Sequence, residues 1–178
     1  MKHIIVDIDQ QMLDRARTRW LAHPDSKRKV FRNSNHTFNG YVGEEVFQKA
    51  FPEALTTQFL RTSDLYNYDF LLDKKRIEVK TKTSKVEPIP DYYDCSVLEY
   101  LKEHQKPDFY VHIRNVEENG VYVRGHILGI ISADKFYNGT CFTVNKGDIL
   151  ANTGRKAEAT SFNCFVSDLN HFQHRYVK

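Results

Sequence analysis

The chain has 178 residues, 40% hydrophobic and 28% charged, which is enough for one compact domain with a buried core. Its apolar runs are far shorter than the ~20 residues that a membrane-spanning helix needs, and its first residues are too acidic for a signal peptide. The three cysteines, Cys95, Cys141 and Cys164, form no C-x-x-C pair, which argues against a disulfide scaffold or a zinc ribbon. We therefore expect free thiols, a cytoplasmic location, no membrane partner and a single domain over residues 1–178.

The charge balance is mildly basic, with a net charge of +3 and a pI of about 8.7. An excess of this size does not by itself indicate nucleic-acid binding. It does not exclude a polyanionic partner either. Carboxylates that bind a cation lower the net charge of the sequence, so the net charge can understate how basic the rest of the surface is.

The hydrophobic pattern alternates between helical and strand periods along the chain. This order predicts an α/β or α+β domain around one mixed sheet, with its core over about 40–131. The N-terminal helix and the C-terminal strands are expected to be additions to that core. In chain order, the predicted segments are a helix at 9–22, a basic loop at 23–39, a helix at 41–51, strands near 58–60, 68–72 and 76–83, a short helix at 96–105, two strands joined across Asn119-Gly120, and strands at 140–144 and 159–166.

The predicted hairpin over 68–83 carries a group of charged residues whose direction follows from the strand register. A two-residue loop at 74–75 and a four-residue loop at 73–76 both place Asp69 opposite Lys80 and diagonal to Glu78. A three-residue loop would turn Asp69 toward the apolar side, and the hydrophobic pattern rejects it. The apolar residues share the other face, with Leu72 opposite Ile77 and Phe70 opposite Val79.

Two carboxylates and an ammonium group on the inner part of a sheet are costly unless something offsets their burial. A divalent cation does so, because Mg²⁺ prefers oxygen ligands and takes one or two carboxylates together with water and phosphate. A lysine beside the cation can stabilise developing negative charge or orient an attacking water. The set Asp69, Glu78 and Lys80 therefore favours metal-assisted phosphodiester hydrolysis, with a surface salt-bridge cluster as the alternative.

The helix predicted at 41–51 adds a third acid. On a helical wheel Glu45 points nearly opposite to the apolar face and is expected to be solvated, whereas Glu44 falls at the edge of that face. An acid at such a boundary is either a surface residue or one directed at a site, and the neighbouring hairpin favours the site. The apolar face consists of Val46, Phe47, Ala50, Phe51 and Ala54.

These residues resemble the PD-(D/E)XK nuclease superfamily, which has the restriction-endonuclease-like fold. The resemblance rests on the acidic helix Gly40-Tyr-Val-Gly-Glu44-Glu45, then Asp69, eight residues, and Glu78-Val-Lys80. It covers about residues 40–115 and includes the order of elements: helix, strand, strand with Asp, strand with Glu-x-Lys, helix, strand. One departure is Tyr68, which stands where the motif name has proline.

The resemblance implies a Mg²⁺-dependent endonuclease that hydrolyses DNA, with Mn²⁺ as a substitute metal. In this sequence it implies that Asp69 and Glu78 hold the metal, helped by the backbone carbonyl of Val79. It also implies that Lys80 positions or activates the water and that Glu44 is an auxiliary acid and a further metal ligand. A homodimer would match the two strands of a duplex.

Several basic residues are weaker candidates for contacts to the nucleic-acid backbone. Lys82 is expected to share the face of Lys80, and Lys27, Arg28 and Lys29 lie in the predicted basic loop, where solvated side chains are the simpler interpretation. Two alternatives to a nuclease stay open. One is a nuclease-like module that binds nucleic acid or a protein partner without activity, and the other is a small β-rich ligand-binding domain with an incidental charge cluster.

Overall fold

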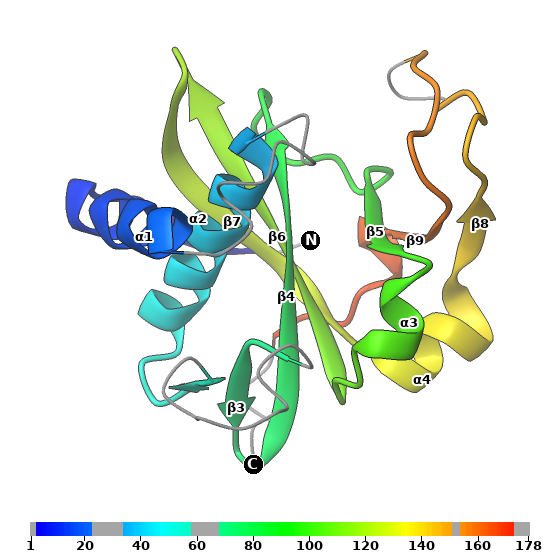
Figure 1. The fold of residues 1–178 in the computed structure, drawn as a ribbon, viewed down its shortest axis with the longest axis horizontal. Coiled ribbons are helices and arrows are strands. Elements are labelled where there is room, and N and C mark those ends of the chain that lie inside the picture. Colours follow the sequence, from blue (N-terminus) through cyan, green and yellow to red (C-terminus); the bar gives the residue numbers. More distant parts are fainter. Residues whose placement is uncertain (1–2, 23–33, 58–67, 151–153, 173–178) are drawn as a thin grey trace.

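The computed structural model describes residues 3–22, 34–57, 68–150 and 154–172, and this part of the chain contains two β-sheets and a set of helices (Figure 1). In the larger sheet, β4 and β6 run parallel and the other neighbours are antiparallel. Its strand order is β1 (Ile4–Asp7), β7 (Val121–Ser132), β6 (Phe109–Glu118), β4 (Lys75–Ser84), β3 (Phe70–Leu72) and β2 (Leu55–Thr56). The smaller, antiparallel sheet has the order β5 (Asp94–Leu98), β9 (Ser161–Phe165) and β8 (Phe142–Val144).

The helices differ in length and lie on both sides of the larger sheet. Figure 1 shows α1 and α2 on one side and the smaller sheet with α3 and α4 on the other. The fold is therefore mixed α+β, with a mixed sheet flanked by helices. None of the helices within the described ranges is long and apolar enough to cross a membrane. The helices are α1 (Gln10–Ala22), α2 (Ser34–Ala50), α3 (Leu101–His104) and α4 (Ala133–Lys135), which continues into a π-helical turn at Phe136–Thr140, and a 3₁₀ turn at Val166–Asp168.

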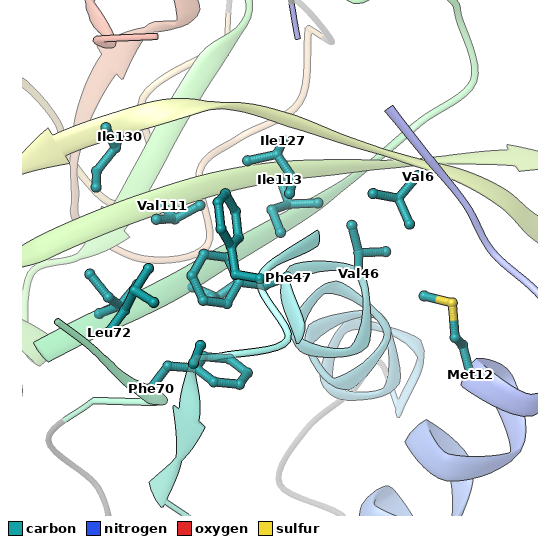
Figure 2. Close-up of a cluster of buried hydrophobic side chains, with 14 residues drawn as sticks. Val6, Met12, Val46, Phe47, Phe70, Leu72, Val111, Ile113, Ile127 and Ile130 are labelled. Atoms are coloured by element: carbon teal, nitrogen blue, oxygen red, sulfur yellow. The ribbon is translucent and has the colours of Figure 1, made fainter. Parts of the chain in front are cut away.

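A hydrophobic core fills the space between α2 and the larger sheet. Phe47 of α2 lies at its centre, with its ring centroid 4.9 Å from those of both Phe51 and Phe70 (Figure 2). The apolar face expected for this helix thus packs on the apolar face expected for the hairpin. A second core, on the opposite face of the sheet, includes Tyr110, Leu128 and Phe136. Because both faces of the sheet are covered, charged residues beyond the first two positions of β4 are buried or half-buried.

The helix α2 approaches β4 very closely at Gly43. A Cβ atom on Gly43 would lie 2.0 Å from Oγ1 of Thr81, so only glycine fits at this point. This contact brings the next residue, Glu44, against the strand that carries Glu78 and Lys80.

The β3–β4 hairpin has the predicted faces but a different register. Its turn is Asp73-Lys74, whose φ angles of 47° and 63° are those of a two-residue hairpin turn. Phe70 therefore pairs with Ile77, where the sequence predicted Val79, and Leu72 pairs with Lys75. The shift is two residues, and side chains alternate with a period of two, so each residue keeps its predicted face.

Other predictions were wrong in detail. The expected loop at 23–39 is helical from Ser34 onward, because α2 begins seven residues before the predicted start at 41. The expected helix at 96–105 is instead strand β5 followed by the single turn α3. Pairing with β9 buries Cys95 and Val97, which explains why the strand forms there. The strand expected near 58–60 lies outside the described residues.

Strand β1, helix α4 with its π-helical turn and the 3₁₀ turn at Val166–Asp168 were not predicted, whereas two other elements were predicted correctly. The helix at 9–22 is confirmed, and Asp9 caps it by accepting a hydrogen bond from the Met12 N–H at 2.9 Å. The hairpin at Asn119-Gly120 is confirmed, with φ angles of 51° and 82°. All three cysteines are free, and two of them, Cys95 and Cys164, are buried.

Candidate active site

Asp69 lies immediately before β3 and is held by strands on both sides. Its backbone N–H donates to the Ile77 carbonyl at 2.9 Å, and its own carbonyl accepts from the Thr57 N–H at 3.0 Å. Its carboxylate accepts a hydrogen bond from the Val79 N–H at 2.8 Å. The carboxylate of Asp69 therefore takes the place of a backbone acceptor at the point where β3 begins.

This geometry also sets the direction of the Val79 carbonyl. In an antiparallel pair the N–H and C=O of one residue point to the same neighbour. Since the N–H of Val79 reaches Asp69, the carbonyl of Val79 points to the same side of β4. A backbone oxygen is thus directed to the side on which the Asp69 carboxylate lies, as the resemblance implies for a metal ligand.

Glu78 and Lys80 project from the face of β4 opposite to Ile77 and Val79, and they share a partner at the end of α3. Nζ of Lys80 lies 2.8 Å from Oε1 of Glu78 and donates to Oε1 of Gln105 at 2.9 Å. Nε2 of Gln105 donates to the same Glu78 oxygen at 2.7 Å. The three side chains form a closed triangle in which Gln105 fixes both the carboxylate and the ammonium group.

Glu44 approaches from α2 and is joined to α1 through Arg19. The Arg19 guanidinium forms ion pairs with Glu44 and, at 3.3 Å, with Glu45. Arg15 adds a contact to Glu45 at 2.6 Å. The expectation that Glu45 is solvated was wrong: its exposed fraction is 8%, because α1 lies over the side of α2 that the helical wheel left to solvent.

The carboxylates lie close enough to change one another's protonation. Burial, followed by repulsion from Glu78 and Glu44, raises the pKa of Asp69 well above its ordinary value, against the opposing effects of Lys80 and the Val79 N–H. Burial likewise raises the pKa of Glu44, although its ion pair with Arg19 acts in the opposite direction. Glu44, Asp69, Glu78 and Lys80 therefore act on one another electrostatically around the start of β3.

The donor types of these residues can be compared with those that Mg²⁺ requires. Asp69 and Glu78 supply carboxylate oxygens, and Val79 adds a backbone carbonyl on the same side of β4 as Asp69. Mg²⁺ needs only one or two carboxylates, because water and phosphate complete its coordination. Within the described ranges, however, no group of three or more His, Cys, Asp or Glu side chains is arranged as a metal site. The carboxylate of Glu44 forms an ion pair with Arg19. We therefore treat Glu44 as a residue near the proposed ligands and not as a ligand itself.

The weaker basic candidates have different outcomes. Lys82 forms an ion pair with Asp94 of β5, which also lies 3.5 Å from Arg114, so its ammonium group is engaged within the protein. Lys27, Arg28 and Lys29 lie outside the described residues.

Two residues of the site were missed from the sequence. Gln105 was assigned to a helix that proved to be a single turn, and its only signal was its position just before Pro107. Arg19 lies among the apolar residues of the helix predicted at 9–22, and that position was its only signal in the sequence. No protein-family model matches this chain, and neither do the curated proteins or the solved structures compared with it.

Proposed function

We propose that this protein is a Mg²⁺-dependent nuclease that hydrolyses phosphodiester bonds in DNA. The observation that carries the proposal is the position of the Asp69 carboxylate, which accepts a hydrogen bond from the Val79 N–H at 2.8 Å on the strand that also bears the Glu78–Lys80 ion pair. Partly buried carboxylates destabilise the fold when no cation is bound. With a divalent cation bound, the same carboxylates are suited to phosphate chemistry.

The order of elements supports a restriction-endonuclease-like fold for the same region. From α2 to β6 the chain runs through a helix, the strands β2, β3 and β4, the turn α3 and the strand β6. The strand with Glu78 and Lys80 pairs in parallel with β6, as a crossover through α3 requires. This arrangement matches the order that the resemblance implies, with β5 inserted before α3.

In the proposed reaction Asp69 and Glu78 hold the metal, with the Val79 carbonyl as a third oxygen. A bound Mg²⁺ would polarise the scissile phosphate and lower the pKa of a water molecule. Lys80 has three N–H donors, of which Glu78 and Gln105 take one each. The third donor is available to orient the attacking water or to bind a phosphate oxygen.

The proposal is tested by cleavage of supercoiled plasmid DNA with Mg²⁺, with Mn²⁺ and with EDTA. We expect cleavage that EDTA abolishes, and a loss of about 10²–10⁴-fold in rate for Lys80→Ala, the range for a positioned group that aids proton transfer. Lys75→Ala is the matched control, because Lys75 is an exposed residue of the same strand. Circular dichroism and DNA binding measured in EDTA should be unchanged in both variants.

Equal cleavage by Lys80→Ala and the wild type would overturn the assignment of Lys80. Absence of cleavage with either metal, together with metal-independent DNA binding, would overturn the nuclease proposal in favour of an inactive nucleic-acid-binding module.

A further inference from the structure

A second cavity lies away from the carboxylates, where α1 and the start of α2 meet the tip of the β6–β7 hairpin. It has a volume of about 440 Å³, and three aromatic side chains, from three different elements, line it: Trp20, Phe38 and Tyr122. The ring centroids of Trp20 and Phe38 are 6.0 Å apart, and those of Phe38 and Tyr122 are 6.2 Å apart. All three rings are half-buried, so the cavity, called here the aromatic cleft, presents aromatic surface to solvent.

Arg17 supplies the aromatic cleft with a positive charge that no acidic side chain of the described residues pairs with. The three arginines of α1 differ in this respect, since Arg15 and Arg19 are paired with Glu45 and Glu44. Arg17 lines the cleft, is exposed, and has no ion-pair partner within the described ranges. An exposed guanidinium beside aromatic rings is suited to an anionic ligand that also has a planar ring.

Two further polar groups constrain the ligand. Glu117 and Gln10 also line the aromatic cleft. The amide nitrogen of Gln10 is engaged with Asp14 at 2.8 Å, which leaves its oxygen as an acceptor. The cleft thus offers acceptors for an N–H group of a base, aromatic surface for a planar ring and a cation for a phosphate, which together match one nucleotide.

We propose that the aromatic cleft binds a nucleotide of single-stranded DNA, with the base stacked on the aromatic side chains and a phosphate on Arg17. A base within a duplex is stacked between neighbouring bases, so its ring faces cannot contact aromatic side chains. The ring faces of an unpaired base can make this contact. The protein would therefore prefer DNA with an unpaired segment over a fully paired duplex.

Strand β4 links the aromatic cleft to the candidate active site, with Thr83 and Lys80 on opposite faces of the strand. The hydroxyl groups of Tyr122 and Thr83 lie 3.5 Å apart. Thr83 is three residues beyond Lys80 on β4, which is about 10 Å along a strand. The inference that the bound strand is the substrate rests on the proposed nuclease function, whereas binding in the aromatic cleft does not.

The test uses Trp20, which is the only tryptophan of the chain, so its fluorescence reports on the aromatic cleft directly. The full-length protein in EDTA is titrated with a short oligothymidylate and with a hairpin duplex of equal length. We expect the oligothymidylate to quench the Trp20 emission and to bind more tightly than the duplex. In a parallel anisotropy titration with labelled oligothymidylate, Trp20→Ala should weaken binding about 5- to 150-fold, the range for loss of one stacking side chain.

Arg17→Ala provides the second readout. Removal of one phosphate contact should lower the slope of log K against log salt concentration by about 0.7 for a single strand. Lys135→Ala is the matched control, because Lys135 is exposed on α4, on the opposite side of the molecule from α1 (Figure 1). It should leave both the affinity and the slope at wild-type values.

The results separate this inference from the nuclease proposal. Unchanged Trp20 emission at saturating oligonucleotide, or an Arg17→Ala salt slope equal to that of the wild type, would overturn binding in the aromatic cleft even if the protein cuts DNA. Quenching together with the Arg17 effect would establish the cleft even if no cleavage occurs. Tighter binding of the duplex would overturn the preference for an unpaired strand.

Discussion

The three arginines of α1 give a sharp test of how the helix is attached to the rest of the protein. Arg19 lies between Glu44 and Glu45, and the exposed fractions of the three side chains are 19%, 16% and 9%. Arg15 contacts Glu45 but is 54% exposed, and Arg17 has no carboxylate partner within the described ranges. The same substitution, arginine to alanine, therefore removes a largely buried ion pair, an exposed one, or none.

The magnitudes follow from these environments. Removal of one partner of a buried pair costs about 3–5 kcal/mol, because the other charge is left buried without compensation. Two acids lose their shared cation in Arg19→Ala, so we expect a decrease in the free energy of unfolding of about 3 kcal/mol or more. Arg15→Ala removes an exposed pair, for which about 0–1 kcal/mol is typical. Arg17→Ala should stay within about 0.5 kcal/mol of the wild type.

Chemical denaturation followed by circular dichroism measures the three differences. With a shift of about 2–4 °C per kcal/mol for a chain of this size, Arg19→Ala should lower the Tm by about 6 °C or more. Adding Glu44→Gln to Arg19→Ala should recover part of the loss, because it removes the charge that Arg19→Ala leaves without a cation, whereas Glu45 keeps its contact to Arg15. Equal stabilities for the Arg19 and Arg17 variants would refute the reasoning that Glu44 and Glu45 need Arg19.

Three further predictions concern the packing and charge of the candidate site. Gly43→Ala should lower the free energy of unfolding by about 1–3 kcal/mol in thermal denaturation, because the new Cβ would lie 2.0 Å from Thr81 Oγ1. Because the pKa of Asp69 is raised in the folded protein, its contribution to stability is present below the ordinary carboxyl pKa and is lost as the pH rises through the raised value. Asp69→Asn, which keeps an acceptor for the Val79 N–H, should therefore be more stable than the wild type at neutral pH without metal, by about 0.5–2 kcal/mol, and the gain should vanish in acid. Gln105→Ala should lower the cleavage rate less than Lys80→Ala does, and Gln105→Glu should not restore it, since a carboxylate cannot donate to the neighbouring acid.

The hairpin shows what the sequence determines and what it leaves open. The alternation of apolar and charged residues determines which side chains share a face, and the four apolar residues of the hairpin share one buried cluster as predicted: Phe70, Leu72, Ile77 and Val79. The alternation did not determine the pairing partners, because these depend on the position of the turn. Both hairpin turns adopt positive φ angles, but Asp73-Lys74 is a weaker turn signal in the sequence than Asn119-Gly120. A slip of two residues leaves the faces unchanged, so the site could be predicted although the register was wrong.

The errors arose where a distant segment decides the local structure. Glu45 looked solvated on the wheel of its own helix, and only the packing of α1 against α2 buries it. Residues 94–98 have a pattern that permits a short helix, and pairing with β9, more than 60 positions later, selects the strand. Gln105 entered the site for the same reason, because the strand shortened the helix that follows. Periodicity within one segment carries no information about such partners.

The charge pairing around the site separates the proposed function from an ordinary salt-bridge cluster. In a structural cluster, each buried acid is expected to have a cation of its own. Glu44 has Arg19 and Glu78 has Lys80, but no Lys, Arg or His within the described ranges lies at ion-pair distance from Asp69. A single backbone N–H therefore faces a carboxylate that two neighbouring acids also repel. A cation bound at Asp69 would offset this repulsion, and the proposed chemistry depends on that binding.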